Sequence, residues 1–500
     1  MRSSLFIKQT TFRVSTIVMV KAIGLIGRIS LTRLIGAEGI GLYQIAYSYY
    51  GLALMVITGG LPTALALYTA RHPQHSWVWF KNISIYLVLM GGSISMLSFY
   101  FSGGISQLLG NPELYYFIRC LAPALFAVPL LSLLRGYLQG MERYNVIAVS
   151  ELIEQAVRVL FMLALVFLLL PNGPAFAAGK SMLGTLFGAL SAFFVLILYF
   201  FYYSNQQSSI SSTQKYTLFR TDLKWFFHSS FIISLTRLLT PLSDVLDAII
   251  IPGRLQVAGY STAQATSMFG VLTGMAVLIV YMPTIATAAL SHTLTMKLVT
   301  DWRERKYDLF NRRTRLALEA GWVWGCSSSL FLFVYNTEVS CILFGSAEAA
   351  EPIKYLSIIP LLVGLREIST SILWAQDRKT APLFGLVSGI GIAVTLHYFL
   401  VAIPGFNYLG ASVGILVLEI IAVGWNLKSL LPVLKKINYS KLLADSVIVI
   451  GAMMIVLLVS SIHVLHGFSE NIRALIGMAL YGGMIISYIY LRFIAKGGDS

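Results

Sequence analysis

Apolar stretches long enough to cross a bilayer recur along this chain of 500 residues, and they constrain its fold more than any other feature. About 20 apolar residues cross the hydrocarbon core of a membrane. Fourteen such stretches have centres near residues 24, 55, 91, 126, 158, 191, 238, 275, 328, 363, 391, 420, 454 and 482. Only 11% of the residues are charged, against about 25% in soluble domains. The sequence therefore predicts an all-α polytopic membrane protein with about fourteen transmembrane helices.

The distribution of lysine and arginine predicts the orientation of these helices. With the N-terminus in the cytoplasm, 25 of the 36 basic residues fall at cytoplasmic ends and loops, 5 fall outside and 6 lie within helices. This bias follows the positive-inside rule, and an even number of helices places both termini in the cytoplasm. It also accounts for the net charge of +15 without nucleic acid, because the charge is spread over many short loops.

The chain also contains signs of an internal repeat. "LPT" at 61–63 corresponds to "MPT" at 282–284, and "LLGNPE" at 108–113 corresponds to "LFGSAE" at 343–348. Each pair keeps its place relative to the predicted helices, which indicates two copies of a six-helix unit. Since six is even, the copies share one orientation and form parallel repeats around a central cavity, as in transporters that work by alternating access.

The repeat predicts four parts of the chain. These are an N-terminal lobe at 1–203, a cytoplasmic linker at 204–222, a C-terminal lobe at 223–434 and two appended helices at 435–500. A two-lobe transporter of this kind can work as a monomer.

Charged residues inside the predicted helices are the candidate functional residues. Lys21 and Arg28 are seven residues apart, close to two helical turns, so they share one face of the first helix. Arg237 and Asp244 are also seven residues apart on the seventh helix, and Asp247 is one further turn on; this helix holds the equivalent place in the second repeat. Charges within a membrane usually face the protein interior and pair with one another.

Two interpretations of these charges remain open. Lys21, Arg28 and Arg237 could form a cationic cavity that binds an anionic headgroup such as phosphate or pyrophosphate, which arginine grips in a bidentate way. Alternatively, Lys21 or Arg28 could pair with Asp244 or Asp247 and hold the lobes together. The two aspartates could also bind a coupling Na+ or H+.

Other intramembrane charges are less informative. Glu154 and Arg158 are one turn apart, so we expect them to neutralise each other within their helix. Arg33 and Arg254 are expected to reach the outer surface of the membrane. The sequence leaves open which way four further charges face, and these are Arg119, Arg366, Glu367 and Glu419.

Two repeat-equivalent helices contain proline, which breaks backbone hydrogen bonding. Gly59 and Gly60 precede Pro62 in one helix, and Pro283 interrupts the other. These four residues are candidate hinges for alternating access, and static kinks that improve packing are the alternative.

Catalytic and metal-binding patterns are not recognisable in the sequence. The three cysteines suggest neither a disulfide framework nor a metal site. We therefore expect a protein that is not an enzyme and that needs neither a metal nor a cofactor beyond the possible coupling ion.

One long motif is similar to a known family. The segment "RLIGAEGIGLYQIAYSYYGLALMVITGGLPTALALYTAR" at 33–71 resembles the opening of the polysaccharide-biosynthesis branch of the multidrug/oligosaccharidyl-lipid/polysaccharide exporter superfamily. "LQGMER" at 138–143 also resembles that branch, and the fourteen-helix plan is similar to that of the stage V sporulation protein B and lipid II flippase groups.

The resemblance implies a V-shaped, two-lobe flippase. Such a protein would move an undecaprenyl-pyrophosphate-linked glycan from the inner to the outer leaflet of the bacterial cytoplasmic membrane, in cell-wall, spore-cortex or other polysaccharide synthesis. Lys21 and Arg28 match the basic first helix of the family. The sequence departs from lipid II flippases because helices 2 and 8 lack arginine through the membrane.

A cation-coupled multidrug exporter of the same superfamily is the alternative function. Asp244 and Asp247 suit such an exporter, whereas the cations of the first helix do not. A glycan polymerase or ligase would need large outer loops with catalytic residues, and the predicted outer loops are short.

Overall fold

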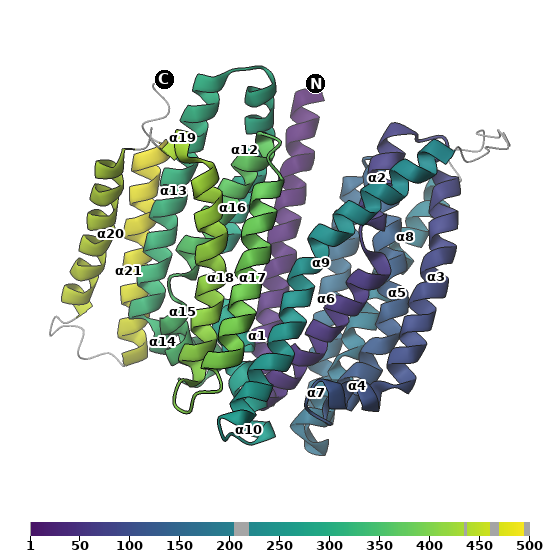
Figure 1. The fold of residues 1–500 in the computed structure, drawn as a ribbon, viewed down its shortest axis with the longest axis horizontal. Coiled ribbons are helices and arrows are strands. Elements are labelled where there is room, and N and C mark those ends of the chain that lie inside the picture. Colours follow the sequence, from purple (N-terminus) through teal and green to yellow (C-terminus); the bar gives the residue numbers. More distant parts are fainter. Residues whose placement is uncertain (1, 205–219, 435–437, 461–469, 495–500) are drawn as a thin grey trace. The chain divides into compact units, whose positions relative to one another are not determined.

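The computed structural model describes residues 2–204, 220–434, 438–460 and 470–494, and within these ranges every regular element is a helix (Figure 1). Among the described residues, eleven helices are long and apolar enough to cross a membrane, or twelve when the bent pair α15 and α16 counts as one span. The predicted all-α polytopic membrane protein is thereby confirmed. Most of the predicted linker, residues 205–219, lies outside the described ranges.

All fourteen predicted centres fall within helical residues. The first two lie in one 57-residue helix, α1 (Arg2–Thr58), which is why a count by length and composition is lower than fourteen. The seventh centre lies in α9 (Arg220–Val257), and the tenth lies in the second helix of a pair bent by 42°. The exact number of spans stays a prediction.

The chain folds into two compact units. Unit 1 contains Met1–Gly253 and Ser261–Gly270, and unit 2 contains Arg254–Tyr260 and Val271–Ser500. Most of α9 therefore belongs to unit 1, although the repeat pattern groups this helix with the second lobe. The repeat and its lobe boundaries stay a prediction.

The described part of unit 1 contains ten α-helices, the last residues of α9 excepted, and one 3-10 helix (Leu170–Asn172). The α-helices are α1 (Arg2–Thr58), α2 (Leu61–Arg71), α3 (Ser76–Tyr100), α4 (Ser102–Leu108), α5 (Leu114–Gly140), α6 (Tyr144–Leu169), α7 (Pro174–Ser181), α8 (Leu183–Ser204), α9 (Arg220–Val257) and α10 (Thr262–Phe269).

Helix α1 changes direction at Gly36. This residue has φ 70° and ψ −173°, a backbone conformation that glycine adopts at little cost because it has no Cβ. The bend separates the segment that carries Lys21 and Arg28 from the one that carries Tyr43 and later residues. Both segments can then pack within the same bundle.

Glycines bring the neighbours of α6 very close to its backbone. A Cβ added at Gly184 or Gly188 of α8 would lie 2.7 Å from the carbonyl oxygen of Arg158 or Glu154, respectively. Gly27 of α1 also packs directly against α6. Small residues allow this close approach between membrane helices, and here they fix the position of α6, which carries Glu154 and Arg158.

Unit 2 continues the chain from residue 271. Its main helices are α11 (Val277–Val280), α12 (Thr284–Arg303), α13 (Tyr307–Val334), α14 (Asn336–Phe344), α15 (Ala350–Leu356), α16 (Ile359–Ala375), α17 (Thr380–Leu400), α18 (Asn407–Ser429), α19 (Leu431–Leu434), α20 (Tyr439–Ser460) and α21 (Glu470–Ile489). A π-helix (Gly270–Ala276) precedes them and another (Tyr490–Ile494) follows α21.

The last two long helices are joined to α13 by polar contacts. Arg492 donates to Asp445 of α20 at 3.2 Å and to Glu319 of α13 at 3.1 Å. Trp322 of α13 donates to Ser446 of α20 at 3.0 Å. Residues from three helices thus share one ionic network, so α20 and α21 are part of unit 2 and not a loose extension.

Candidate anion-binding site

Three arginines and one glutamate meet inside unit 1, together with two tyrosines. We call Arg28, Tyr43, Tyr47, Arg135, Glu154 and Arg158 the arginine cluster. Arg135 Nη1 lies 2.6 Å from Glu154 Oε2, and Arg158 forms an ion pair with the other carboxylate oxygen. Arg135 Nε also donates to Ser150 Oγ at 3.0 Å. One carboxylate therefore binds two guanidinium groups from two different helices.

The two tyrosines connect the third arginine to this ion pair. The rings of Tyr43 and Tyr47 stack with centroids 5.5 Å apart and planes 7° apart. The Arg28 guanidinium lies 5.5 Å from the centre of the Tyr43 ring and also donates to Gln44. Arg158 Nη1 donates to the Tyr47 hydroxyl at 3.4 Å. Cation–π contact and hydrogen bonding thus link Arg28 to Arg158 through two rings.

Each arginine of the cluster keeps a buried N–H group that no described residue accepts. These groups are Arg28 Nε, Arg135 Nη2 and Arg158 Nε. A buried donor without an acceptor costs roughly 1–3 kcal/mol. Phosphate oxygens are strong acceptors for guanidinium, so an anion that reaches the cluster would satisfy donors that the fold leaves open.

The structure separates the two basic residues predicted on the first helix. Arg28 is half-buried within the arginine cluster, whereas Lys21 is exposed two turns earlier on α1. Among the described residues, Arg28 contacts Gln44 and Tyr43. The pairing of Lys21 or Arg28 with Asp244 or Asp247 stays a prediction.

The charged residues predicted on the seventh helix all lie on α9 of unit 1. Arg237 and Asp244 are exposed, and Asp247 is half-buried. Their proposed parts in headgroup binding and cation coupling stay predictions.

The four candidate hinge residues lie at or beside breaks between helices. Gly59 has φ 47° and ends α1, and the backbone N–H of Gly60 donates to Ser234 Oγ of α9 at 2.7 Å. Pro62 then falls in the first turn of α2, where a missing N–H costs nothing. Pro283 directly precedes α12 in unit 2. Movement at these breaks stays a prediction.

Unit 2 contains a second buried ionic group, and it resolves charges whose direction the sequence leaves open. Arg366 of α16 binds Glu419 of α18 with Nε 2.5 Å from Oε2. The Tyr281 hydroxyl donates to the same carboxylate at 3.1 Å. Glu367 accepts from Thr287 of α12 at 2.9 Å. We call Tyr281, Thr287, Arg366, Glu367 and Glu419 the glutamate cluster.

Sequence reasoning missed Arg135 and the tyrosine pair. Tyr43 and Tyr47 lie one helical turn apart in the sequence, and this spacing could have predicted that the two side chains are neighbours. The pairing of Arg135 with Glu154 carries no such signal, because these residues lie on different helices.

Comparison with known proteins decides the family. The model of the polysaccharide biosynthesis protein family matches residues 6–289, more than half of the chain. The chain belongs to this family. The resemblance found in the motif at 33–71 is thereby confirmed.

Two curated relatives come from Bacillus subtilis (strain 168). Stage V sporulation protein B is 26% identical over 423 residues, which cover 83% of this chain and 81% of that protein. Lipid II flippase MurJ is 24% identical over 406 residues, which cover 75% of this chain and 74% of that protein.

Solved structures share the fold. A lipid II flippase MurJ in an inward closed conformation matches with TM-score 0.72 and 14% identity, over 97% of this chain and 98% of that chain. An inward-facing multidrug resistance MATE family transporter of the MOP superfamily matches with TM-score 0.67 and 13% identity, over 85% and 99%. The fold is therefore that of multi-pass membrane transporters.

Proposed function

We propose that this protein is a flippase for a lipid-linked glycan. It moves an undecaprenyl-pyrophosphate-linked sugar unit, such as a peptidoglycan precursor, from the inner to the outer leaflet of the bacterial cytoplasmic membrane. The similarity to stage V sporulation protein B and to MurJ supports this class of substrate. The observation that carries the proposal is the arginine cluster with its three open N–H donors.

The chemistry of the cluster suits a diphosphate. Three guanidinium groups and one carboxylate leave an excess of positive charge among the cluster residues, and arginine binds phosphate oxygens through paired, directional hydrogen bonds. The exposed Lys21 on the same helix as Arg28 adds a mobile point charge. A pyrophosphate would first meet Lys21 and then displace weaker neutral contacts such as that between Arg28 and Gln44.

Several accompanying features belong to the same proposal. Asp244 and Asp247 on α9 couple transport to Na+ or H+, and the protein catalyses no bond cleavage. It acts as a monomer by alternating access, with both termini in the cytoplasm. Movement at Gly59, Gly60, Pro62 and Pro283 opens the substrate path.

Native mass spectrometry of the purified protein tests the proposal directly. We expect wild-type protein to carry a polyprenyl-pyrophosphate glycan, and the double variant Lys21→Ala/Arg28→Ala to lose it. Arg33→Ala is the matched control, because Arg33 is an exposed cation on the same helix. The mass of the bound species identifies the sugar.

A cation-coupled multidrug exporter is the competing function, and the fold match to a MATE transporter favours it. The flippase proposal would be overturned if the wild-type protein bound organic cations and neither the wild type nor the double variant carried a glycolipid. Equal glycolipid binding by the wild type and the double variant would leave the flippase function standing but remove Lys21 and Arg28 from its site.

A further inference from the structure

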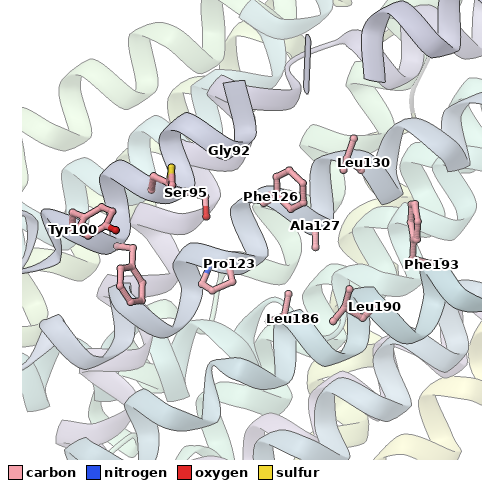
Figure 2. A pocket seen from close by; sticks show the side chains of 12 residues that line it. Gly92, Ser95, Tyr100, Pro123, Phe126, Ala127, Leu130, Leu186, Leu190 and Phe193 are labelled. Carbon is pink, nitrogen blue, oxygen red and sulfur yellow. The ribbon is translucent and has the colours of Figure 1, made fainter. Parts of the chain in front are cut away.

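An apolar groove opens on unit 1, and no residue of the arginine cluster lines it. Side chains from α3, α5 and α8 surround it, and its volume is about 570 Å³ (Figure 2). That volume is within the range of roughly 300–1,000 Å³ typical of small-molecule sites. The three helices are candidate membrane spans, so the groove faces the region that lipid chains occupy.

The walls of the groove are apolar along its length. Phe126, Leu190 and Phe193 are among the side chains that Figure 2 shows around the hollow. The Ser95 hydroxyl, one of the polar groups there, donates to the Ala122 carbonyl at 2.7 Å and is therefore already used within the protein. Such a surface offers dispersion contacts to a hydrocarbon chain and little to a polar ligand.

One end of the groove carries a cation. The Arg119 guanidinium lies 4.5 Å from the centre of the Phe99 ring, and Phe99 lines the groove. Arg119 is exposed, and it also donates to the Tyr115 hydroxyl. Its long side chain is thus held beside the groove while its charged end stays open to a phosphate.

Aromatic residues mark the same end as the level of lipid headgroups. Tyr100, 75% exposed, closes α3, and Tyr115 and Tyr116 begin α5. Tyr116 packs against Phe176, and the Lys180 ammonium lies 5.4 Å from the centre of that ring. Tyrosine gathers at the membrane–water interface, where anionic phosphates are found.

We propose that this groove binds an anionic glycerophospholipid, with an acyl chain between α3, α5 and α8 and its phosphate at Arg119. The occupant follows from the apolar wall, the location on membrane-spanning helices and the cations at the interfacial end. The proposal does not depend on the transported substrate.

Photoreactive lipids test the proposal in the full-length protein. The protein is reconstituted in vesicles of phosphatidylcholine and phosphatidylglycerol with identical acyl chains, containing a trace of either lipid with a diazirine in mid-chain. We expect the phosphatidylglycerol probe to label residues 92–100, 123–130 and 186–193 about fivefold more than the phosphatidylcholine probe. Equal labelling by the two probes would overturn the proposal.

Two variants separate the chain site from the phosphate site. A Cβ added at Gly92 would find only Phe126 Cδ2, at 3.9 Å, so Gly92→Leu fills the groove without striking a backbone. We expect it to reduce labelling of all three segments at least fivefold. Gly451→Leu is the control, because a Cβ there meets nothing within 4 Å. Ala127→Leu fills the groove from α5 if Gly92→Leu fails to fold.

Arg119→Gln should abolish the preference for phosphatidylglycerol while leaving labelling by phosphatidylcholine unchanged. Arg254→Gln is its control, since Arg254 also lies over an aromatic ring, 4.1 Å from the centre of Tyr398. Undiminished labelling in Gly92→Leu and Ala127→Leu would overturn the proposal. Stronger labelling by a polyprenyl phosphate probe, unaffected by added phosphatidylglycerol, would also overturn it and assign the groove to a different lipid.

Discussion

The two units each bury an ionic cluster, but the clusters have opposite charge balance. The arginine cluster of unit 1 holds three guanidinium groups and one carboxylate. The glutamate cluster of unit 2 holds one guanidinium group and two carboxylates. The first leaves three arginine N–H groups without an acceptor among the residues that the structure describes, whereas Glu419 is bound by both Arg366 and Tyr281.

This difference teaches that burial of charge alone does not mark a binding site. A cluster whose charges and hydrogen bonds are matched within the protein needs no ligand to balance them. A cluster with excess charge and open donors gains from a ligand. We therefore propose that unit 1 binds the ligand and that the Arg366–Glu419 pair of unit 2 has a mainly structural part. Four experiments test this contrast.

Removal of the Glu154 carboxylate from the arginine cluster should have the largest effect on stability. Glu154→Ala removes the carboxylate that pairs with both Arg135 and Arg158. Glu419→Ala removes the carboxylate that pairs with Arg366 alone. Breaking a buried pair costs about 3–5 kcal/mol, and we expect Glu154→Ala near the upper limit and Glu419→Ala near the lower one. Thermal unfolding in detergent measures both.

Glu304→Ala is the control for this pair of variants, because Glu304 forms an exposed ion pair with Lys306. Its unfolding temperature should stay close to that of the wild type, because an exposed ion pair contributes little to stability. A smaller loss in Glu154→Ala than in Glu419→Ala would contradict the charge balance described above.

A comparison of transport by two variants tests whether each cluster takes part in function. One variant neutralises an arginine of the arginine cluster, and the other neutralises both members of the Arg366–Glu419 pair. Arg158→Gln should reduce glycolipid transport about tenfold to a hundredfold, the value of a charge-assisted hydrogen bond. The double variant Arg366→Gln/Glu419→Gln removes two opposite charges together, so we expect transport within about threefold of wild type. Transport assays in proteoliposomes measure both effects. A larger loss of transport in the double variant than in Arg158→Gln would make unit 2 part of the binding site.

The close packing that positions the arginine cluster is also testable. Gly188→Ala places a Cβ 2.7 Å from the Glu154 carbonyl oxygen, so α8 must move away from α6. Overpacking of this kind costs about 1–3 kcal/mol. Gly451→Ala, with open space around the new Cβ, should have no such cost. Comparable unfolding temperatures for the two variants would show that α6 tolerates displacement.

The smallest effects are expected at the two helix breaks. Ser234→Ala removes the acceptor of the Gly60 N–H in unit 1, and Trp324→Phe removes the donor to the Pro283 carbonyl in unit 2, a contact of 2.8 Å. Each should lower stability by about 1 kcal/mol. Hydrogen exchange at the residues around each break measures local opening. Unchanged exchange rates in both variants would show that these two hydrogen bonds do not hold the breaks closed.

Much of the fold could be predicted because membrane insertion depends on local sequence. Segment length and hydropathy identified the helical regions, and the candidate hinge residue Gly59 stands directly after the end of α1. Intramembrane charge also singled out Arg28 and Arg158, which the structure places in one cluster. The charge of a residue and its spacing from other residues of the same helix follow directly from the sequence.

The partners of those charges could not be predicted in the same way. The i, i+4 pair of Glu154 and Arg158 was expected, but Arg135 joins it from α5, 19 positions earlier. Arg366 and Glu419 are 53 positions apart, and their direction was open until α16 and α18 were seen together. Such pairs depend on how each helix is rotated about its axis, and the sequence of one helix does not fix that rotation.

The sequence by itself determined that this is a helical membrane protein of the polysaccharide biosynthesis family, because hydropathy and family motifs are read along one dimension. Tertiary structure alone decided that Arg28 reaches Arg158 through two tyrosines, that Arg366 pairs with Glu419 in unit 2, and that α3, α5 and α8 leave a groove. Each of these features is made by side chains from separate segments, and only the packing of helices brings those segments within contact distance.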